Sequence, residues 1–166
     1  MQGHLAAIRP RHITAALLAA AILGTSASPA LADDPSPQFT PENAAQVLPP
    51  GYTLQGDDYV YDDGNVIVTP AAATASKPCK AGWLCLYEHA DWKGHRWMFR
   101  EHRWQDLTPY GANDQVSSWR NYERRTAYLG WHSIAEHIGE RLTLSAGASS
   151  HYVGSHWNDQ ASSVLP

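Results

Sequence analysis

One six-residue segment occurs twice in this chain, and the spacing of its two copies limits the folds that the chain can adopt. The segment reads NDQVSS at residues 113–118 and NDQASS at residues 158–163, 45 residues further along. An internal repeat at such a spacing is typical of a supersecondary unit that is present twice. We therefore expect one domain built from two similar halves.

The same spacing relates residues outside the repeated segment. Sliding the chain on itself without a gap pairs Trp83 with Tyr128, Leu84 with Leu129, Leu86 with Trp131, Ala90 with Ala135, Gly94 with Gly139, Arg96 with Arg141, Trp97 with Leu142 and Phe99 with Leu144. We therefore place repeat one at about 77–121 and repeat two at about 122–166.

Apolar residues inside the repeats indicate short strands. Residues 83–87 and 96–100 are short apolar alternations separated by Gly, Asp and Lys, and they show no period of helix length. Several short strands in each of two repeats predict an all-β fold, with two Greek-key motifs packed as a β-sandwich. All seven tryptophans fall in residues 83–157, where they supply apolar area for a core.

The first 32 residues resemble a secretory signal peptide. Basic residues precede an apolar run over residues 13–23, and the run is followed by Ala30-Leu31-Ala32, an A-x-A cleavage pattern. The alternative, an N-terminal membrane anchor, is disfavoured because the run is shorter than the ~20 residues that a spanning helix needs. We expect a secreted, monomeric protein that begins near Asp33 and has no membrane partner.

Residues 33–76 differ in composition from the C-terminal part of the chain. They hold seven acidic residues and no Lys or Arg, whereas residues 77–166 hold ten basic and nine acidic residues. Within this Pro- and Ala-containing extension, residues 59–68 alternate around Asp63-Gly64 and predict a β-hairpin, which is expected to dock on the C-terminal domain. Residues 69–78 are interpreted as a linker. Without a basic domain, nucleic acid is a poor candidate partner.

Export also decides how the two cysteines are interpreted. Cys79 and Cys85 are close in sequence, and in an oxidising compartment such a pair closes into a disulfide. A C-x-x-C redox site and a zinc knuckle are disfavoured by the spacing and by the lack of a second cysteine pair.

The repeated segment is rich in hard oxygen ligands. It combines carboxylate, amide, hydroxyl and backbone oxygens, which suit Ca²⁺ with its six to eight oxygen ligands. One short segment cannot supply that many, so each copy is expected to contribute to two sites. The alternative is that Asn, Asp and Ser only form turns, which they favour in any loop. Two copies at one spacing favour the calcium interpretation.

Both copies match the Asn/Asp-Asn/Asp-x-x-Ser/Thr-Ser pattern, and in this the chain resembles microbial βγ-crystallin domains that bind calcium. Repeat one also carries the aromatic-x4-aromatic-x-Gly corner of that family, as Tyr87, Trp92 and Gly94. Repeat two departs from it, with His132 and His137 in the aromatic places and Gly139 retained.

The resemblance implies two Ca²⁺ sites with a defined set of ligands. Side-chain oxygens would come from Asp114 and Asp159, backbone carbonyls from Gln115 and Gln160, hydroxyls from Ser117 and Ser162, and further backbone carbonyls from near Glu88 and Ser133. Hydrogen bonds from Asn113, Asn158, Ser118 and Ser163 would hold the loops in shape.

A resemblance to a more specific family rests on several longer stretches of sequence. The C-x5-C element with Gly-Trp-Leu inside it, LYEHADWKGH, WQDL, YGANDQVSSWRN and TAYLG resemble the secreted bacterial inhibitor family typified by the Streptomyces metalloproteinase inhibitor, inhibitor family thirty-six. This resemblance implies inhibition of an extracellular metallopeptidase, although it does not identify the inhibitory loop. Bacterial killer-toxin-like proteins share the scaffold, so the resemblance supports the fold more strongly than it supports the inhibitory activity.

Three other classes of function compete with inhibition. A calcium-stabilised structural module without inhibitory activity needs only the two metal sites. A cell-wall or carbohydrate-binding module would need exposed aromatic platforms, for which Trp92, Trp104 and Trp157 are the candidates because Trp83, Trp97 and Trp119 occupy strand positions. An enzyme is not expected, since HExxH and GxSxG are absent and His132 and His137 stand at structural positions of the repeat.

Overall fold

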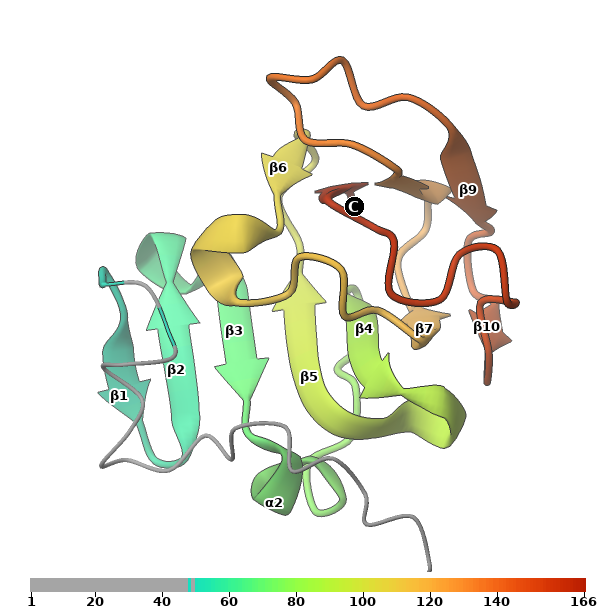
Figure 1. Cartoon of the computed structure of the whole chain (residues 1–166). Helices are drawn as coiled ribbons and strands as arrows, with labels where there is room; N and C mark the ends of the chain where they lie inside the picture. Colours follow the sequence, from blue (N-terminus) through green and yellow to red (C-terminus); the bar gives the residue numbers. More distant parts are fainter. Residues whose placement is uncertain (1–47, 49) are drawn as a thin grey trace, which may run out of the picture. The chain divides into compact units, whose positions relative to one another are not determined.

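The structure is a computed structural model that describes residue 48 and residues 50–166, and these residues form two antiparallel sheets (Figure 1). The predicted signal peptide and most of the Pro-rich start of the extension lie outside the described residues. None of the helices in the described part is long and apolar enough to cross a membrane.

The first sheet has seven strands in the order β1 (Thr53–Gln55), β2 (Asp58–Tyr61), β3 (Val66–Thr69), β5 (Lys93–Phe99), β4 (Leu84–His89), β7 (Ser118–Asn121) and β10 (Ser149–Ser150). The second sheet has four strands in the order β6 (Gln105–Asp106), β11 (Ser163–Leu165), β8 (Ala127–Gly130) and β9 (Arg141–Leu144). Single helical turns are η1 (Asp62–Gly64), α2 (Ala71–Thr74), η2 (Ala90–Trp92) and η3 (Thr108–Tyr110).

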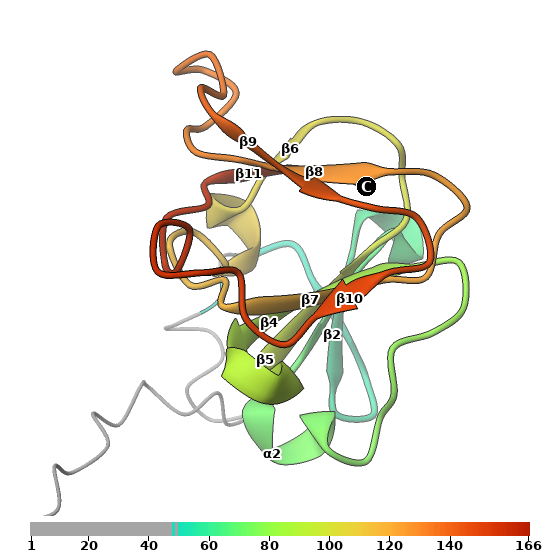
Figure 2. The same cartoon turned by 90° about the vertical axis from the view of Figure 1, so that its right-hand side faces the viewer.

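Each repeat is a Greek key that lends its third strand to the sheet of the other repeat. Repeat one provides β4 to β7 and repeat two provides β8 to β11, yet β6 pairs with β11 and β10 pairs with β7. Figure 2 shows the two sheets as facing layers. The predicted all-β sandwich of two Greek keys is therefore confirmed, and the exchange of strands links the repeats.

The main core lies between these two layers. Its fully buried side chains include Trp97 and Phe99 from β5, Leu86 from β4, and Leu129 and Leu144 from the second sheet. Trp97 can be buried without an unpaired donor because its Nε1 donates to the Tyr110 carbonyl at 2.8 Å. Alternation of apolar residues along the strands thus produces the core that the sequence predicted.

The gap-free register between the repeats is wrong over their first strands. Tyr87 pairs with Ser118 in one sheet and Gly130 pairs with Ser163 in the other, so the counterpart of Tyr87 is Gly130 and not His132. Over the second strands the register holds, with Phe99 equivalent to Leu144. The difference arises in the connection between the strands, which has ten residues in repeat two (131–140, between the paired Gly130 and Arg141) and eight in repeat one (88–95, between the paired Tyr87 and Arg96).

The predicted hairpin of the extension is present and is part of the first sheet. Asp63 and Gly64 have φ values of 50° and 89°, and the N–H of Asn65 donates to the carbonyl of Asp62 at 2.9 Å, as in a tight primed turn. Strand β3 pairs with β5 along four residues, so β1 to β3 extend the sheet of repeat one. Tyr110 Oη also donates to Asp62 Oδ2 at 2.7 Å, which ties the turn to η3.

The segment interpreted as a linker, residues 69–78, is instead ordered structure on the outer face of the first sheet. It contains the end of β3 and the helix α2. Arg96, which is only 1% exposed, donates to Thr69 Oγ1 at 2.8 Å and to the Lys77 carbonyl. A buried guanidinium needs such acceptors, and here they hold the segment against the sheet.

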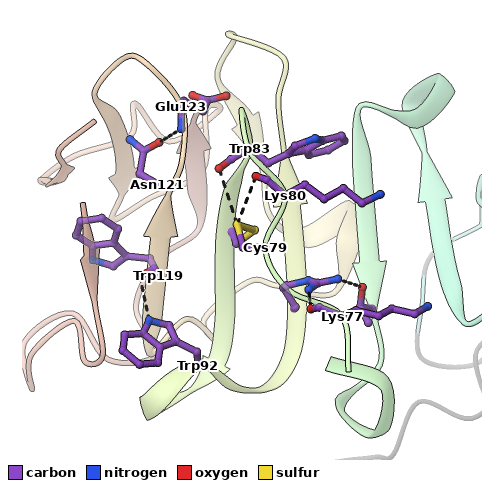
Figure 3. The surroundings of a disulfide bond; sticks show 11 residues. Lys77, Cys79, Lys80, Trp83, Trp92, Trp119, Asn121 and Glu123 are labelled. Atoms are coloured by element: carbon purple, nitrogen blue, oxygen red, sulfur yellow. Dashed lines mark hydrogen bonds between the residues drawn. A yellow bond between two sulfur atoms is a disulfide. The ribbon is translucent and has the colours of Figure 1, made fainter. Parts of the chain in front are cut away.

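The predicted disulfide between Cys79 and Cys85 is present, and it closes the loop that covers this outer face (Figure 3). Both cysteines belong to a second, smaller apolar cluster with Met98 and Trp83. Lys80 and Arg100 lie over the Trp83 ring, with their charged groups 6.0 Å and 5.0 Å from its centroid. The loop therefore shields the face of the sheet that points away from the main core.

The tryptophans follow the sequence expectation in part, since Trp92 and Trp104, expected to be free, are half-buried and are covered by Arg120 and Arg141. Trp83, Trp97 and Trp119 are buried as expected, whereas the freedom expected for Trp157 is wrong because its side chain is only 6% exposed. It packs edge-on against Trp131, with ring centroids 5.3 Å apart. Trp157 therefore belongs to the core and is not a binding platform.

Candidate metal centre

The two copies of the repeated segment lie side by side, although they are far apart in sequence. The N–H of Asp114 donates to the carbonyl of Ala161 at 2.9 Å, and the N–H of Asp159 donates to the carbonyl of Val116 at 3.3 Å. Each copy immediately precedes the last strand of its repeat, β7 or β11. The exchange of strands between the sheets thus brings the copies together with approximate two-fold symmetry.

The local backbone orients the two carboxylates. Asp114 and Asp159 have φ values of 55° and 57°, a left-handed conformation that Asp tolerates better than most residues. Asn113 Nδ2 donates to Asp114 Oδ2 at 2.7 Å, and Asn158 donates to Asp159 in the same way. The Asn before each Asp therefore fixes the carboxylate of its own loop.

Each carboxylate lies against a hydroxyl of the other repeat. Ser117 Oγ donates to Asp159 Oδ1 at 3.4 Å, and Ser162 Oγ donates to Asp114 Oδ1 at 3.3 Å. The structure thus creates two similar clusters, each with a carboxylate from one repeat and a hydroxyl from the other. This agrees with the prediction that each copy contributes ligands to both sites, because one short segment cannot fill the coordination shell of Ca²⁺.

The second Ser of each copy anchors its loop to the strand connection beside it. Ser118 Oγ donates to the carbonyl of His89 at 2.6 Å, and Ser163 Oγ donates to the carbonyl of His132 at 2.7 Å. These two carbonyls are equivalent in the corrected register. Both serines are fully buried, so they position the loops and do not line the clusters.

Glu88 and Ser133 are not equivalent positions. In the corrected register the counterpart of Glu88 is Trp131, because Tyr87 corresponds to Gly130. The Ser133 carbonyl accepts the N–H of Ile138 at 3.0 Å within its own loop. A backbone ligand equivalent to that of Glu88 would therefore come from Trp131.

The side chain of Glu88 is engaged elsewhere. Its Oε2 accepts the His95 Nδ1–H at 2.5 Å and the His95 backbone N–H at 2.9 Å, and both side chains are buried. Burial raises the pKa of Glu88, but the hydrogen bonds and charge of His95 outweigh it, so the net pKa is lowered. Glu88 is thus an ionised, paired carboxylate behind the cluster of Ser117 and Asp159.

The electrostatics of Asp159 favour a cation nearby. Burial raises the pKa of this carboxyl, and the charge of Glu88 raises it further, against the lowering effects of Ser117 and His89. A carboxylate whose pKa is raised beside a second carboxylate is stabilised by any positive charge that binds next to it.

Beside the clusters is an open cavity of about 720 Å³. The loop copies and the β8–β9 connection line it, with Thr108, Asn113, Asp114, Trp131, His132, Ser133, Ala135, Glu136, Asp159, Gln160 and Ser162. Sequence reasoning missed Trp131 and Glu136 because the gap-free register gave no sign of the longer connection. Gln115 and Gln160, the predicted backbone ligands, are both exposed, and Gln160 lines the cavity.

The donor set fits calcium and not a metal that prefers nitrogen or sulfur ligands. Within residues 48 and 50–166, no group of three or more His, Cys, Asp and Glu side chains converges as a metal cluster. Carboxylate and hydroxyl oxygens meet at each position, and Ca²⁺ completes such sets with backbone carbonyls and water. Asp114 with Ser162, and Asp159 with Ser117, are the side chains that would hold it.

The corner glycines have a steric role beside these loops. Gly94 and Gly139 have φ values of 75° and 72°, and a Cβ at Gly94 would lie 2.8 Å from Glu88 Cβ. At Gly139 a Cβ would lie 2.7 Å from His132 Cδ2. Tyr87 is buried and Trp92 donates its Nε1–H to the Trp119 carbonyl, so the aromatic corner of repeat one is packed.

Comparison with known proteins finds a family match over the central segment of the chain. Residues 72–133 match peptidase inhibitor family I36. A structure from work on the evolution of the eye lens βγ-crystallin domain fold is 23% identical, covers 54% of this chain and 89% of its own, and has a TM-score of 0.48. The N-terminal domain of protein S is 16% identical, with coverage of 50% and 92% and a TM-score of 0.42. No curated protein matches at a significant level.

Proposed function

We propose, from the match of residues 72–133 to peptidase inhibitor family I36, that the protein is a secreted, calcium-binding inhibitor of an extracellular metallopeptidase. The family match is the observation that carries the proposal, and the family is one of inhibitors and not of enzymes. The match includes all of repeat one and the first strand of repeat two.

The architecture supports an inhibitory role. An inhibitor must present a surface that does not rearrange in the peptidase cleft, because ordering a flexible loop on binding costs affinity. Here the two sheets exchange strands, and the Cys79–Cys85 disulfide fixes the outer face. A disulfide also suits an oxidising compartment, which agrees with the A-x-A leader and with secretion.

Calcium would act as a clamp between the repeats. When bound, the cation supplies positive charge that neutralises a carboxylate of one repeat beside a hydroxyl of the other. Asp114 and Ser162 would hold one ion, and Asp159 and Ser117 the other. At a calcium concentration 100 times Kd, each site would stabilise the fold by about 2.7 kcal/mol.

Inhibition is tested first by titrating the purified chain against thermolysin and, in parallel, against a serine peptidase such as subtilisin. We expect tight inhibition of the metallopeptidase and none of the serine peptidase. Inhibition of subtilisin and not of thermolysin would support the inhibitory function but would contradict a metallopeptidase as the target. No inhibition of either enzyme would leave a calcium-stabilised structural module as the alternative.

Calcium binding is tested separately, by calorimetric titration of the chelator-treated protein. We expect saturation near two ions per chain and loss of binding in the Asp114→Ala/Asp159→Ala variant. Asp57→Ala is the control, because the Asp57 carboxylate is exposed and lies in the turn between β1 and β2, away from the repeated segments. Absence of binding heat in the wild type would reduce both loops to turn-forming segments.

A further inference from the structure

The longer connection of repeat two, residues 131–140, projects from the end of the molecule. It joins β8 to β9, and both views show it extending beyond the two sheets (Figures 1 and 2). The equivalent connection of repeat one, residues 88–95, contains the helical turn η2, whose Asp91 N–H donates to the His151 carbonyl at 2.8 Å. The connection of repeat two is thus two residues longer than its counterpart in repeat one.

The backbone of the loop is fixed by its own hydrogen bonds. Trp131 N–H donates to the Glu140 carbonyl at 2.9 Å, and His132 N–H donates to the Ile138 carbonyl at 2.7 Å. From outside the loop, Asp106 Oδ1 accepts the N–H of Ile134 at 2.7 Å. The loop is thus braced without a disulfide.

Three consecutive residues of the loop have positive φ, a backbone conformation that residues other than glycine rarely adopt. His137, Ile138 and Gly139 have consecutive φ values of 70°, 57° and 72°. For a β-branched residue such as Ile138 this region is costly, so it persists only where surrounding contacts determine it. Its side chain packs on Gly130, where an added Cβ would lie 2.5 Å from Ile138 Cγ2. Strain of this kind concentrates at ligand-binding segments.

The tip of the loop exposes an aliphatic side chain. Ile134 is 42% exposed, and its neighbours Ala135, Glu136 and His137 are exposed as well. The exposed Ile134 lies on a segment whose backbone is already ordered, so little conformational entropy remains to be lost when it binds. Ile134 lies in a hydrogen-bonded turn, in which the His137 N–H donates to the Ile134 carbonyl at 3.2 Å. A peptidase cleft is a concave site with apolar subsites, and a protruding aliphatic side chain on a rigid turn fits such a site.

We propose that residues 131–140 are the segment that enters the peptidase cleft, with Ile134 in an apolar specificity pocket. This assignment rests on the proposed inhibitory function and specifies its contact surface. The base of the same loop, through Trp131, Ser133 and Glu136, lines the cavity beside the candidate calcium clusters. A bound cation would therefore also brace the loop.

The test compares Ile134→Asp, Ile134→Leu and Leu54→Asp in thermolysin inhibition assays. Leu54 is the matched control, because it is an exposed aliphatic residue (56%) on the far edge strand β1. We expect Ile134→Asp to raise the inhibition constant about thirtyfold or more, the loss typical of a hot-spot residue. Ile134→Leu and Leu54→Asp should inhibit as the wild type does, and all four proteins should have similar melting temperatures.

A second measurement is hydrogen exchange of the wild-type complex with thermolysin, in which amides of residues 131–140 should gain protection. Wild-type inhibition that survives Ile134→Asp, with no added protection in this loop, would overturn the assignment while leaving the proposed function intact. Absence of inhibition by the wild-type chain would overturn both.

Discussion

Removal of buried methyl groups from the extension tests whether it is an integral part of the domain. Val68 in β3 is fully buried, pairs with Trp97 of β5 and belongs to the main core. Val68→Ala leaves the backbone pairing intact and removes only two methyl groups from that core. The substitution therefore isolates the packing of the extension against repeat one.

The expected loss can be calculated from the burial of those groups. Two methyl groups at about 0.8 kcal/mol each lose about 1.6 kcal/mol of transfer free energy, and the remaining cavity raises the total to about 2 kcal/mol. For a folded unit of this size, such a loss lowers the melting temperature by roughly 6–10 °C. Thermal denaturation monitored by circular dichroism, with chemical denaturation as a second method, measures both quantities.

Leu54→Ala is the control for Val68→Ala, since Leu54 lies on the same extension but is 56% exposed. The control should change the free energy of unfolding by less than about 0.5 kcal/mol. Equal melting of Val68→Ala and the wild type would refute the reasoning and make the extension a passenger. Deletion of residues 33–76 removes β1 to β3 altogether and should leave no cooperative unfolding transition.

Three further predictions concern the covalent link and the carboxylates. Cys79→Ala/Cys85→Ala should lower the free energy of unfolding by about 2 kcal/mol, because the closed loop is short; an unchanged denaturation midpoint would contradict this. The lowered pKa of Glu88 contributes stability above the ordinary pKa of a glutamate, and this contribution is lost as pH falls through the folded value. The stability difference between wild type and Glu88→Gln should therefore shrink on acidification, and a pH-independent difference would count against the His95 pair. Because the pKa of Asp159 is raised, calcium affinity should begin to fall at a pH above the ordinary range of an aspartate. Asp159→Asn should remove that part of the pH dependence in calorimetric titration.

Local chemistry made much of the fold predictable. The Asp63-Gly64 turn allows positive φ at two successive positions, so the hairpin of the extension could be located from sequence. The two copies of the Asn-Asp-Gln-x-Ser-Ser segment indicated two equivalent loops, because the same residues at the same place in a repeat meet the same geometric demands. The sequence spacing of Cys79 and Cys85 indicated the disulfide.

The register of repeat two could not be predicted in the same way. Strand pairing places Gly130 opposite Ser163, whereas the gap-free spacing gives this position to His132. Nothing local marks the longer connection, since the second strands and the repeated segment, which both follow it, keep a spacing of 45 residues. The sequence therefore did not predict the loop that we assign to the peptidase cleft, and only the strand pairing reveals its length.

The sequence by itself determined the class of fold and the identity of the oxygen-rich loops, because apolar alternation, turn residues and repetition act over a few residues. Only the tertiary structure decided which groups meet. Asp114 contacts Ser162, and Asp159 contacts Ser117, because β6 and β10 are exchanged between the sheets and bring the two loops together. The same packing converts residues 69–78 from an apparent linker into a cover for the sheet, since a buried Arg96 must find its acceptors there.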